Sequence, residues 1–97
     1  MYARVTSGQI QTAKMEEAIQ ITKESIIPAI RQQRGLISFT DLIDRRTGTA
    51  MFITLFETEA DMQEGMKSGL VQQQLAKLAP LTVGTPAIDS YEVLAHE

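Results

Sequence analysis

The 97-residue chain has no cysteine, no tryptophan and no asparagine, and its one histidine is His96. The absence of cysteine excludes disulfides and thiolate metal sites. A single histidine, one residue from a chain end of the kind that commonly frays, makes no metal site on its own. We therefore expect neither a metal nor a cofactor in this protein.

The net charge and the hydropathy of the chain restrict which kinds of protein it can be. Nine basic residues against twelve acidic ones give a net charge of −3, which argues against a general nucleic-acid binder because phosphate binding requires a basic surface. No apolar run approaches the ~20 residues of a membrane span, and the first residues lack the apolar core of a signal peptide. We expect a cytoplasmic protein of one domain, residues 1–97, with no nucleic-acid or membrane partner.

The stretch from Gly35 to Glu57 has the pattern of two strands joined by a tight turn. Asp44 readily bonds its own backbone and Gly48 tolerates a positive φ, so the turn lies between them. Because successive side chains of a strand point to opposite faces, each face can be judged separately. In the first run one face carries Ile37, Phe39, Asp41 and Ile43, and the other carries Leu36, Ser38, Thr40 and Leu42. In the second run one face carries Phe52, Thr54 and Phe56, and the other carries Met51, Ile53 and Leu55. Both faces are largely apolar, so something should cover each side of the hairpin.

A short strand and a long helix precede the hairpin. The run from Tyr2 to Thr6 alternates as a strand, and the sequence Ser-Gly-Gln at 7–9 breaks it. Apolar residues then recur at three- and four-residue spacing from about residue 12 to residue 33, which predicts a helix. Its expected landmarks are an N-cap at Thr12, a kink or restart at Pro28 and an end at Gly35.

The segment after the hairpin is predicted to be helical and then extended. Residues 58–61 (Thr-Glu-Ala-Asp) resemble a capping box, and a break near Ser68-Gly69 divides the following helix into two. Residues 80–86 form the expected loop, which carries Leu81 and Val83 as either a lid or a contact with a partner subunit. The last strand is expected from Ile88 to His96. The order β-α-β-β-α-β is typical of the ferredoxin-like α+β fold, a four-stranded antiparallel sheet with both helices on one face.

Two helices can cover only one face of such a sheet, whereas the hairpin is apolar on both. A second copy of the same sheet is the simplest cover for the open face, and two-fold self-association is the commonest form of oligomer. We therefore expect a homodimer that closes sheet against sheet.

Several segments resemble the antibiotic biosynthesis monooxygenase family. They are Gly35-Leu36 opening the second strand, Asp44 to Gly48 at the turn, and Leu55 to Ala60 (LFETEA) leading into the second helix. The resemblance implies a dimeric α+β barrel. Members include cofactor-free oxygenases of quinols and polyketide aromatics, haem-degrading enzymes and proteins of unassigned role.

The chain departs from this family at positions that matter for chemistry. Phe56 stands where the family often has Trp. Haem-degrading members use Asn, Trp and His, and this chain has no Asn or Trp and carries His96 outside the second helix, which disfavours haem binding. The phenol- and quinol-oxidising members use Trp, Asn, Tyr and Arg, of which only Tyr and Arg have possible counterparts here.

Three polar residues are candidates for catalysis. Asp41 lies among Ile37, Phe39 and Ile43 in the sequence pattern; burial would raise its pKa and suit it to accept a phenol or enol proton, whereas pairing with an arginine or a wet strand edge would leave it structural. Arg4 is a candidate partner of Asp41 or a stabiliser of an oxyanion, and we expect it to point away from a helix-packed core because an unpaired buried charge is costly. Tyr91 is a candidate donor to a substrate oxygen, or a core tyrosine with its hydroxyl at the rim.

The phenylalanines supply candidate walls for a ligand. Phe52 and Phe56 share one face of a strand, and Phe39 belongs to the neighbouring strand. They could enclose a small aromatic molecule or form ordinary core and dimer contacts.

Together these features favour a small-molecule-binding homodimer, with cofactor-independent monooxygenation of a phenol or quinol as its activity. The alternative is a non-catalytic ligand-binding or structural dimer of the same fold, which the absence of Trp and Asn favours. A cavity of several hundred cubic ångströms with at least two polar groups would separate the two.

Overall fold

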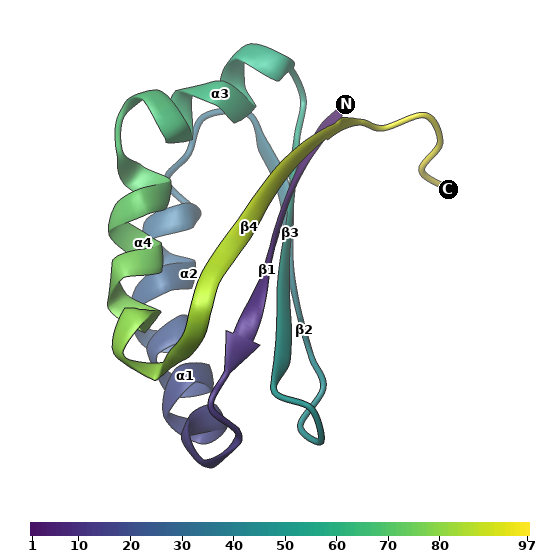
Figure 1. The fold of residues 1–97 in the computed structure, drawn as a ribbon. Coiled ribbons are helices and arrows are strands. Elements are labelled where there is room, and N and C mark those ends of the chain that lie inside the picture. The colour runs from purple at the N-terminus through teal and green to yellow at the C-terminus, as the bar shows by residue number, and fades with distance from the viewer.

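Four antiparallel strands form one sheet in the order β2-β3-β1-β4, and all helices lie on one of its faces (Figure 1). The computed structural model describes all residues from 1 to 97. The strands are β1 (Tyr2–Ile10), β2 (Leu36–Ile43), β3 (Thr49–Phe56) and β4 (Thr82–Glu92). The helical segments are η1 (Thr12–Lys14), α1 (Met15–Ile21), η2 (Thr22–Ile26), α2 (Ile27–Ile30), α3 (Glu59–Lys67), α4 (Leu70–Leu78) and η3 (Ala79–Leu81). The predicted ferredoxin-like order is confirmed, and none of its helices has the length and apolar character needed to cross a bilayer.

The turn between β2 and β3 forms as the sequence predicts. The Asp44 carboxylate accepts hydrogen bonds from the backbone N–H groups of Arg46 at 2.9 Å and Thr47 at 3.3 Å. Gly48 has a φ of 85°, and its N–H donates to the Asp44 carbonyl at 2.8 Å. A side-chain bond to the backbone and a glycine that adopts positive φ therefore fix the hairpin register locally.

The first helical region is less regular than the continuous helix predicted. A π-helical segment, η2, directly precedes α2, in which Pro28 sits in the first turn. Proline has no N–H for the carbonyl four residues earlier and its ring crowds that carbonyl, so the wider π turn accommodates it. This agrees with the kink expected at Pro28. The prediction of Thr12 as a side-chain cap is wrong, because Thr12 already lies inside η1 and no side chain caps that segment.

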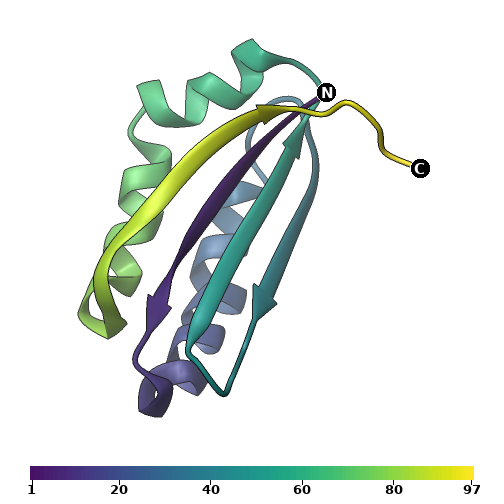
Figure 2. The same cartoon turned by 45° about the vertical axis from the view of Figure 1, so that its right-hand side comes forward.

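Two strand boundaries also differ from expectation. β1 continues through residues 7–9, because all three pair with β3, Gly8 opposite Ala50. β4 begins at Thr82, so most of the segment expected to be a loop is strand. Leu81 is buried in the core and Val83 is exposed on β4, which makes neither residue a lid. Beyond β4 the chain extends away from the sheet, and His96 lies in that extension (Figure 2).

The two faces of the sheet have different neighbours. Paired residues of antiparallel strands share a face, so the helix-facing side carries Arg4, Thr6, Phe39, Asp41, Phe52, Thr54 and Phe56. The opposite side, here called the open face, carries Val5, Leu42, Met51, Ile53, Leu55 and Tyr91, and no helix covers it (Figure 1). Leu42 is 48% exposed and Tyr91 is 55% exposed. The hairpin is thus apolar on both sides and the helices cover only one of them, although Leu55 on the open face is 5% exposed.

Gly35 and Gly69 form a matched pair for testing how closely α3 packs against the sheet. Both have positive φ, 75° and 81°, so alanine at either site costs roughly 1–2 kcal/mol of backbone strain. A Cβ on Gly35 would also lie 2.8 Å from the Asp61 Cβ, whereas one on Gly69 would meet nothing within 4 Å. We expect Gly35→Ala to lower the free energy of unfolding by about 1–3 kcal/mol more than Gly69→Ala, because of that overlap. Urea unfolding measures both, and equal losses would contradict the packing seen here.

Candidate functional site

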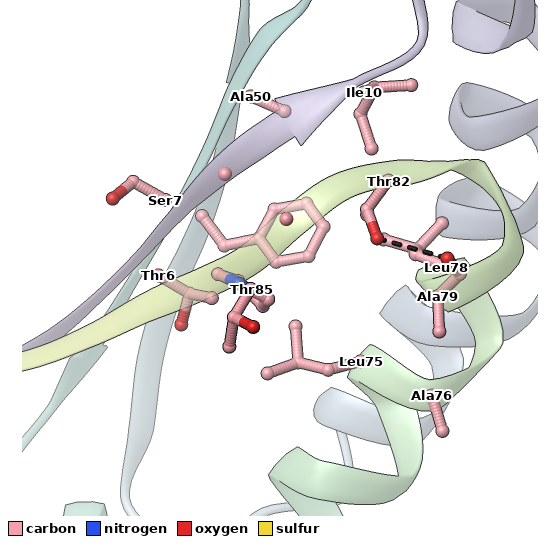
Figure 3. Close-up of a pocket in the computed structure, with 14 residues that line it drawn as sticks. Thr6, Ser7, Ile10, Ala50, Leu75, Ala76, Leu78, Ala79, Thr82 and Thr85 are labelled. Carbon is pink, nitrogen blue, oxygen red and sulfur yellow. Dashed lines mark hydrogen bonds between the residues drawn. The ribbon is translucent and has the colours of Figure 1, made fainter.

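A cavity of about 390 Å³ lies between the sheet and α4 (Figure 3). Thr6 comes from β1, Thr85 from β4, and Leu75 faces them from α4 across the hollow. The full lining is Thr6, Ser7, Gly8, Ile10, Ala50, Phe52, Leu75, Ala76, Leu78, Ala79, Thr82, Gly84, Thr85 and Pro86. Its volume is within the range of about 300–1,000 Å³ typical of small-molecule sites.

The cavity owes its existence to an irregularity in the pairing of β1 with β4. Ser7 pairs with Ala87 and Gln9 pairs with Val83, so three residues of β4 stand opposite Gly8 alone. Such a bulge bends the strand and often lies beside functional sites. Five lining residues are glycine or alanine, namely Gly8, Ala50, Ala76, Ala79 and Gly84. The bend in the edge strand and these small side chains together leave the space unfilled.

The lining is apolar with a few hydroxyl groups and contains no charged side chain. The Thr82 hydroxyl donates to the Ala79 carbonyl at 3.1 Å, which commits it to the turn after α4. Thr6 and Thr85 remain as hydroxyls beside the hollow (Figure 3). The cavity therefore suits a largely apolar molecule that carries one or two oxygen atoms.

Phe52 borders the cavity and two small voids of about 20 Å³ each. It pairs with Thr6 on β1 and with Asp41 on β2. Its ring packs against Phe39 with centroids 5.2 Å apart and planes at 47°. Arg4 lines one of these voids and Asp41 lines the other. Phe52 thus separates the cavity from the two ionisable candidates that the sequence singled out.

Asp41 is partly buried under the first helical region. Its Oδ1 atom is inaccessible to solvent and has no hydrogen-bond partner, and Met15, Ala18 and Thr22 lie around the adjoining void. The Thr22 hydroxyl is engaged with the Ala18 carbonyl at 2.9 Å. Burial disfavours the charged carboxylate and raises the pKa of Asp41. This is the environment predicted for a proton acceptor, although the cavity lies on the other side of Phe52.

Arg4 lies where the sequence argument said it should not. It points into the helix-packed core and is 3% exposed, which corrects that expectation. Its Nη2 donates to the Met62 carbonyl at 2.5 Å, and its guanidinium carbon lies 5.1 Å from the centre of the Phe56 ring. Desolvation lowers the pKa of Arg4. The cation–π contact and the carbonyl offset part of the burial cost, and Arg4 forms no ion pair with Asp41.

The aromatic residues that the sequence offered as site candidates lie in different parts of the structure. Phe52 lines the cavity, Phe39 supports it from β2, and Phe56 is fully buried beneath Arg4 rather than in the cavity wall. Tyr91 is exposed, borders a separate surface groove near Gln63 of α3 and does not reach the cavity. No group of three His, Asp or Glu side chains is arranged to hold a metal ion.

Comparison with solved structures identifies the fold. A candidate antibiotic biosynthesis monooxygenase from Deinococcus radiodurans superposes with a TM-score of 0.81 at 18% identity, covering 100% of this chain and 96% of that one. A candidate from Nitrosomonas europaea gives 0.78 at 17% identity, covering 98% and 100%. A Streptomyces coelicolor monooxygenase solved with nanaomycin D gives 0.76 at 15% identity, covering 99% and 91%.

The chain has the antibiotic biosynthesis monooxygenase fold. The resemblance noted in the sequence is confirmed at the level of this fold. No protein-family model matches the chain.

Two curated relatives, uncharacterised proteins from two Mycobacterium tuberculosis strains, are 27% identical over 95 residues. The chain spans 42% of the length of these relatives, and the match covers 98% of the chain.

Sequence reasoning missed most of the cavity wall. Leu75, Thr85 and the small residues around them were not singled out, because the space depends on a register shift between two distant strands. One local signal was available: Gly84 and Pro86 flank Thr85 inside an otherwise strand-like run, and that composition is typical of a bulge.

Asp41 should make stability depend on pH. Its pKa is raised in the folded state, so the folded protein binds this proton more tightly than the unfolded chain does. The resulting stabilisation is present below the unfolded pKa of about 3.9 and is lost as pH rises through the folded pKa. We expect Asp41→Asn to be more stable than the parent at neutral pH, with an advantage that shrinks toward pH 4. Thermal unfolding across pH 4–8 measures this, with Glu64→Gln at an exposed position of α3 as the reference for loss of one carboxylate. An advantage independent of pH would contradict the prediction.

Proposed function

We propose that the protein is a homodimer whose cavity binds a small phenolic aromatic molecule and oxygenates it with O2 without a cofactor. One observation carries this proposal: an apolar cavity of about 390 Å³ lies one aromatic ring away from a partly buried carboxylate with an unpartnered oxygen. Apolar walls suit the aromatic ring, the hydroxyls of Thr6 and Thr85 suit its oxygens, and Asp41 suits removal of its acidic proton. The monooxygenase solved with nanaomycin D, which has the same fold, supports this class of ligand.

The homodimer is proposed from the open face. No helix covers this face: Leu42 on β2 is 48% exposed, and Val5, Met51 and Ile53 on β1 and β3 are partly exposed. Exposed apolar surface of this kind typically marks an interface. A two-fold arrangement brings the same face of both subunits together, so each supplies the cover that the other lacks.

Charge placed on the open face should dissociate the dimer. Ile53 lies on this face near the middle of β3 and is half-buried, so Ile53→Glu would bury an unpaired carboxylate at the interface. We expect sedimentation to give about one subunit mass for this variant and about two for the parent. Met66→Glu is the matched control, because Met66 is 38% exposed on α3 in the helical layer. A parent that sediments as a monomer would refute the dimer.

The proposed reaction balances without another reductant. Asp41 accepts the hydroxyl proton of a phenol that has a C–H para to the oxygen, once the Phe52 side chain moves aside. The para carbon of the phenolate forms a C–O bond to O2, and Asp41 returns its proton to the resulting peroxide. Loss of the para C–H proton and cleavage of the O–O bond release water and leave a quinone. The substrate supplies all four electrons, one oxygen atom enters the quinone and the other leaves as water.

Oxygen consumption tests this reaction. With 1-naphthol and related phenols as substrates, we expect catalysed O2 uptake and one labelled oxygen in the quinone when 18O2 is used. Asp41→Asn should lower the rate about 100-fold or more, as expected for loss of a general base. Glu64→Gln, at an exposed position of α3, controls for loss of one carboxylate and should match the parent. Uptake that equals the enzyme-free rate throughout the panel would refute the oxygenase.

A non-catalytic binding dimer is the second candidate. The observation that favours it is the lining itself, which holds hydroxyls but no ionisable group in direct contact with the space. Calorimetry with naphthols distinguishes the two functions, since binding without O2 uptake supports the carrier. In Thr85→Trp a large side chain at the mouth should abolish binding in either case, whereas Thr47→Trp in the hairpin turn should not.

A further inference from the structure

The Arg4 guanidinium is a buried cation that the protein leaves without a counter-ion. The two ion pairs of the structure, Arg34 with Asp61 and Arg45 with Glu16, are elsewhere. Of the five N–H donors of Arg4, one is satisfied by the Met62 carbonyl. A buried charge is normally paired, because its desolvation is costly. No negatively charged side chain therefore compensates the positive charge of Arg4 in the interior.

Most of the polar side chains that line the void beside Arg4 can donate a hydrogen bond. Thr6 and Thr54 contribute hydroxyls from neighbouring positions of β1 and β3. The Gln74 Oε1 already accepts from Lys77 Nζ at 2.6 Å, which leaves the Gln74 amide N–H groups as donors. Donors that converge on a cation favour an anionic oxygen at their centre.

The void is also lined by Gln33, whose Oε1 atom can only accept a hydrogen bond, so it would pair with a proton-bearing group and not with an anionic oxygen. The Oε1 atom of Gln33 is inaccessible and has no hydrogen-bond partner. A Cβ on Gly65 of α3 would lie 2.6 Å from that atom and 2.8 Å from Arg4 Nη2. Only glycine lets α3 pass this close, so Gly65 leaves room for both the Arg4 guanidinium and the Gln33 side chain.

The void and the cavity are adjoining spaces. Thr6, Phe52 and Leu75 border both. The void is about 20 Å³, enough for roughly one small molecule such as water, whereas the cavity is about 390 Å³. Rotation of the Phe52 side chain would join them into one pocket with an apolar body and a cationic end.

We propose that the Arg4 void is the anion subsite of the cavity, and that the ligand is an aromatic carboxylate, one anionic oxygen of which pairs with Arg4 behind Phe52. This inference rests on the proposed function in that it assigns the charge of the ligand of the same cavity. The aromatic ring occupies the apolar space between β1, β4 and α4. The anionic oxygen receives hydrogen bonds from Arg4 and Gln74.

A matched pair of ligands tests the subsite. We compare 2-naphthoate with its neutral analogue 2-naphthamide and follow naphthalene emission, which no tryptophan of this chain obscures. A charged hydrogen bond to a buried arginine should favour the carboxylate about 10-fold or more. Arg4→Met should reduce that preference to within about twofold while the affinity for 2-naphthamide is retained. Arg46→Met, which removes an exposed arginine from the hairpin turn, should keep the parent's preference.

A second variant covers the case in which Arg4→Met does not fold. Gly65→Ala keeps the charge and places a methyl group against Arg4 Nη2 and Gln33 Oε1, so the preference for 2-naphthoate should fall there too. Equal binding of both ligands by the parent would overturn the anion subsite and leave the proposed function standing. Binding of neither ligand would also overturn the anion subsite, and O2 uptake with the phenols would then decide the proposed function separately. A preference that survives Arg4→Met would overturn the assignment to Arg4.

Discussion

The packing of one ring, Phe52, connects every part of the candidate site. Its position on β3 places it between Thr6 and Asp41 on the flanking strands, and the helices close over that side of the sheet. A ring in this position excludes water from the middle of the interior and holds apart three spaces that would otherwise be one. Arg4 and Asp41, which line the two small voids beside Phe52, remain in low-dielectric surroundings, where their interactions with a ligand are strongest.

Local chemistry made much of the fold predictable. The Asp44–Gly48 turn, the break at Gly69 and the Thr58 cap, whose hydroxyl accepts from the Asp61 N–H at 3.1 Å, each depend on residues close in sequence. The extension of β1 to Ile10 and the early start of β4 depend on partners far along the chain. Pairing energy from those partners overrides the weak local preference of a Ser-Gly-Gln or Gly-Thr-Pro run.

The error about Arg4 has a physical explanation. A rule that charged side chains avoid helix-packed cores considers desolvation alone, and the sequence does not reveal what lies opposite. Here Phe56 provides a ring face, Met62 a carbonyl and Gly65 the space for the guanidinium. These three residues lie 52 or more positions from Arg4 in the chain, so only the tertiary structure brings the compensation together. The cavity was unpredictable for the same reason, since it arises from a bulge in a non-local strand pair.

Poorly compensated polar groups in this protein are concentrated where a ligand would be most useful. Arg4 lacks a counter-ion, Asp41 Oδ1 and Gln33 Oε1 lack hydrogen-bond partners, and these are the atoms that depart from the general rule that buried polar groups are paired. Arg4 and Asp41 both adjoin Phe52. Such groups lower stability, and natural proteins tend to retain them where function requires them. A fold held together only by its core would have no reason to keep a cation, a carboxylate and an empty space around one ring, and this is why we assign chemistry to that region and not to the open face.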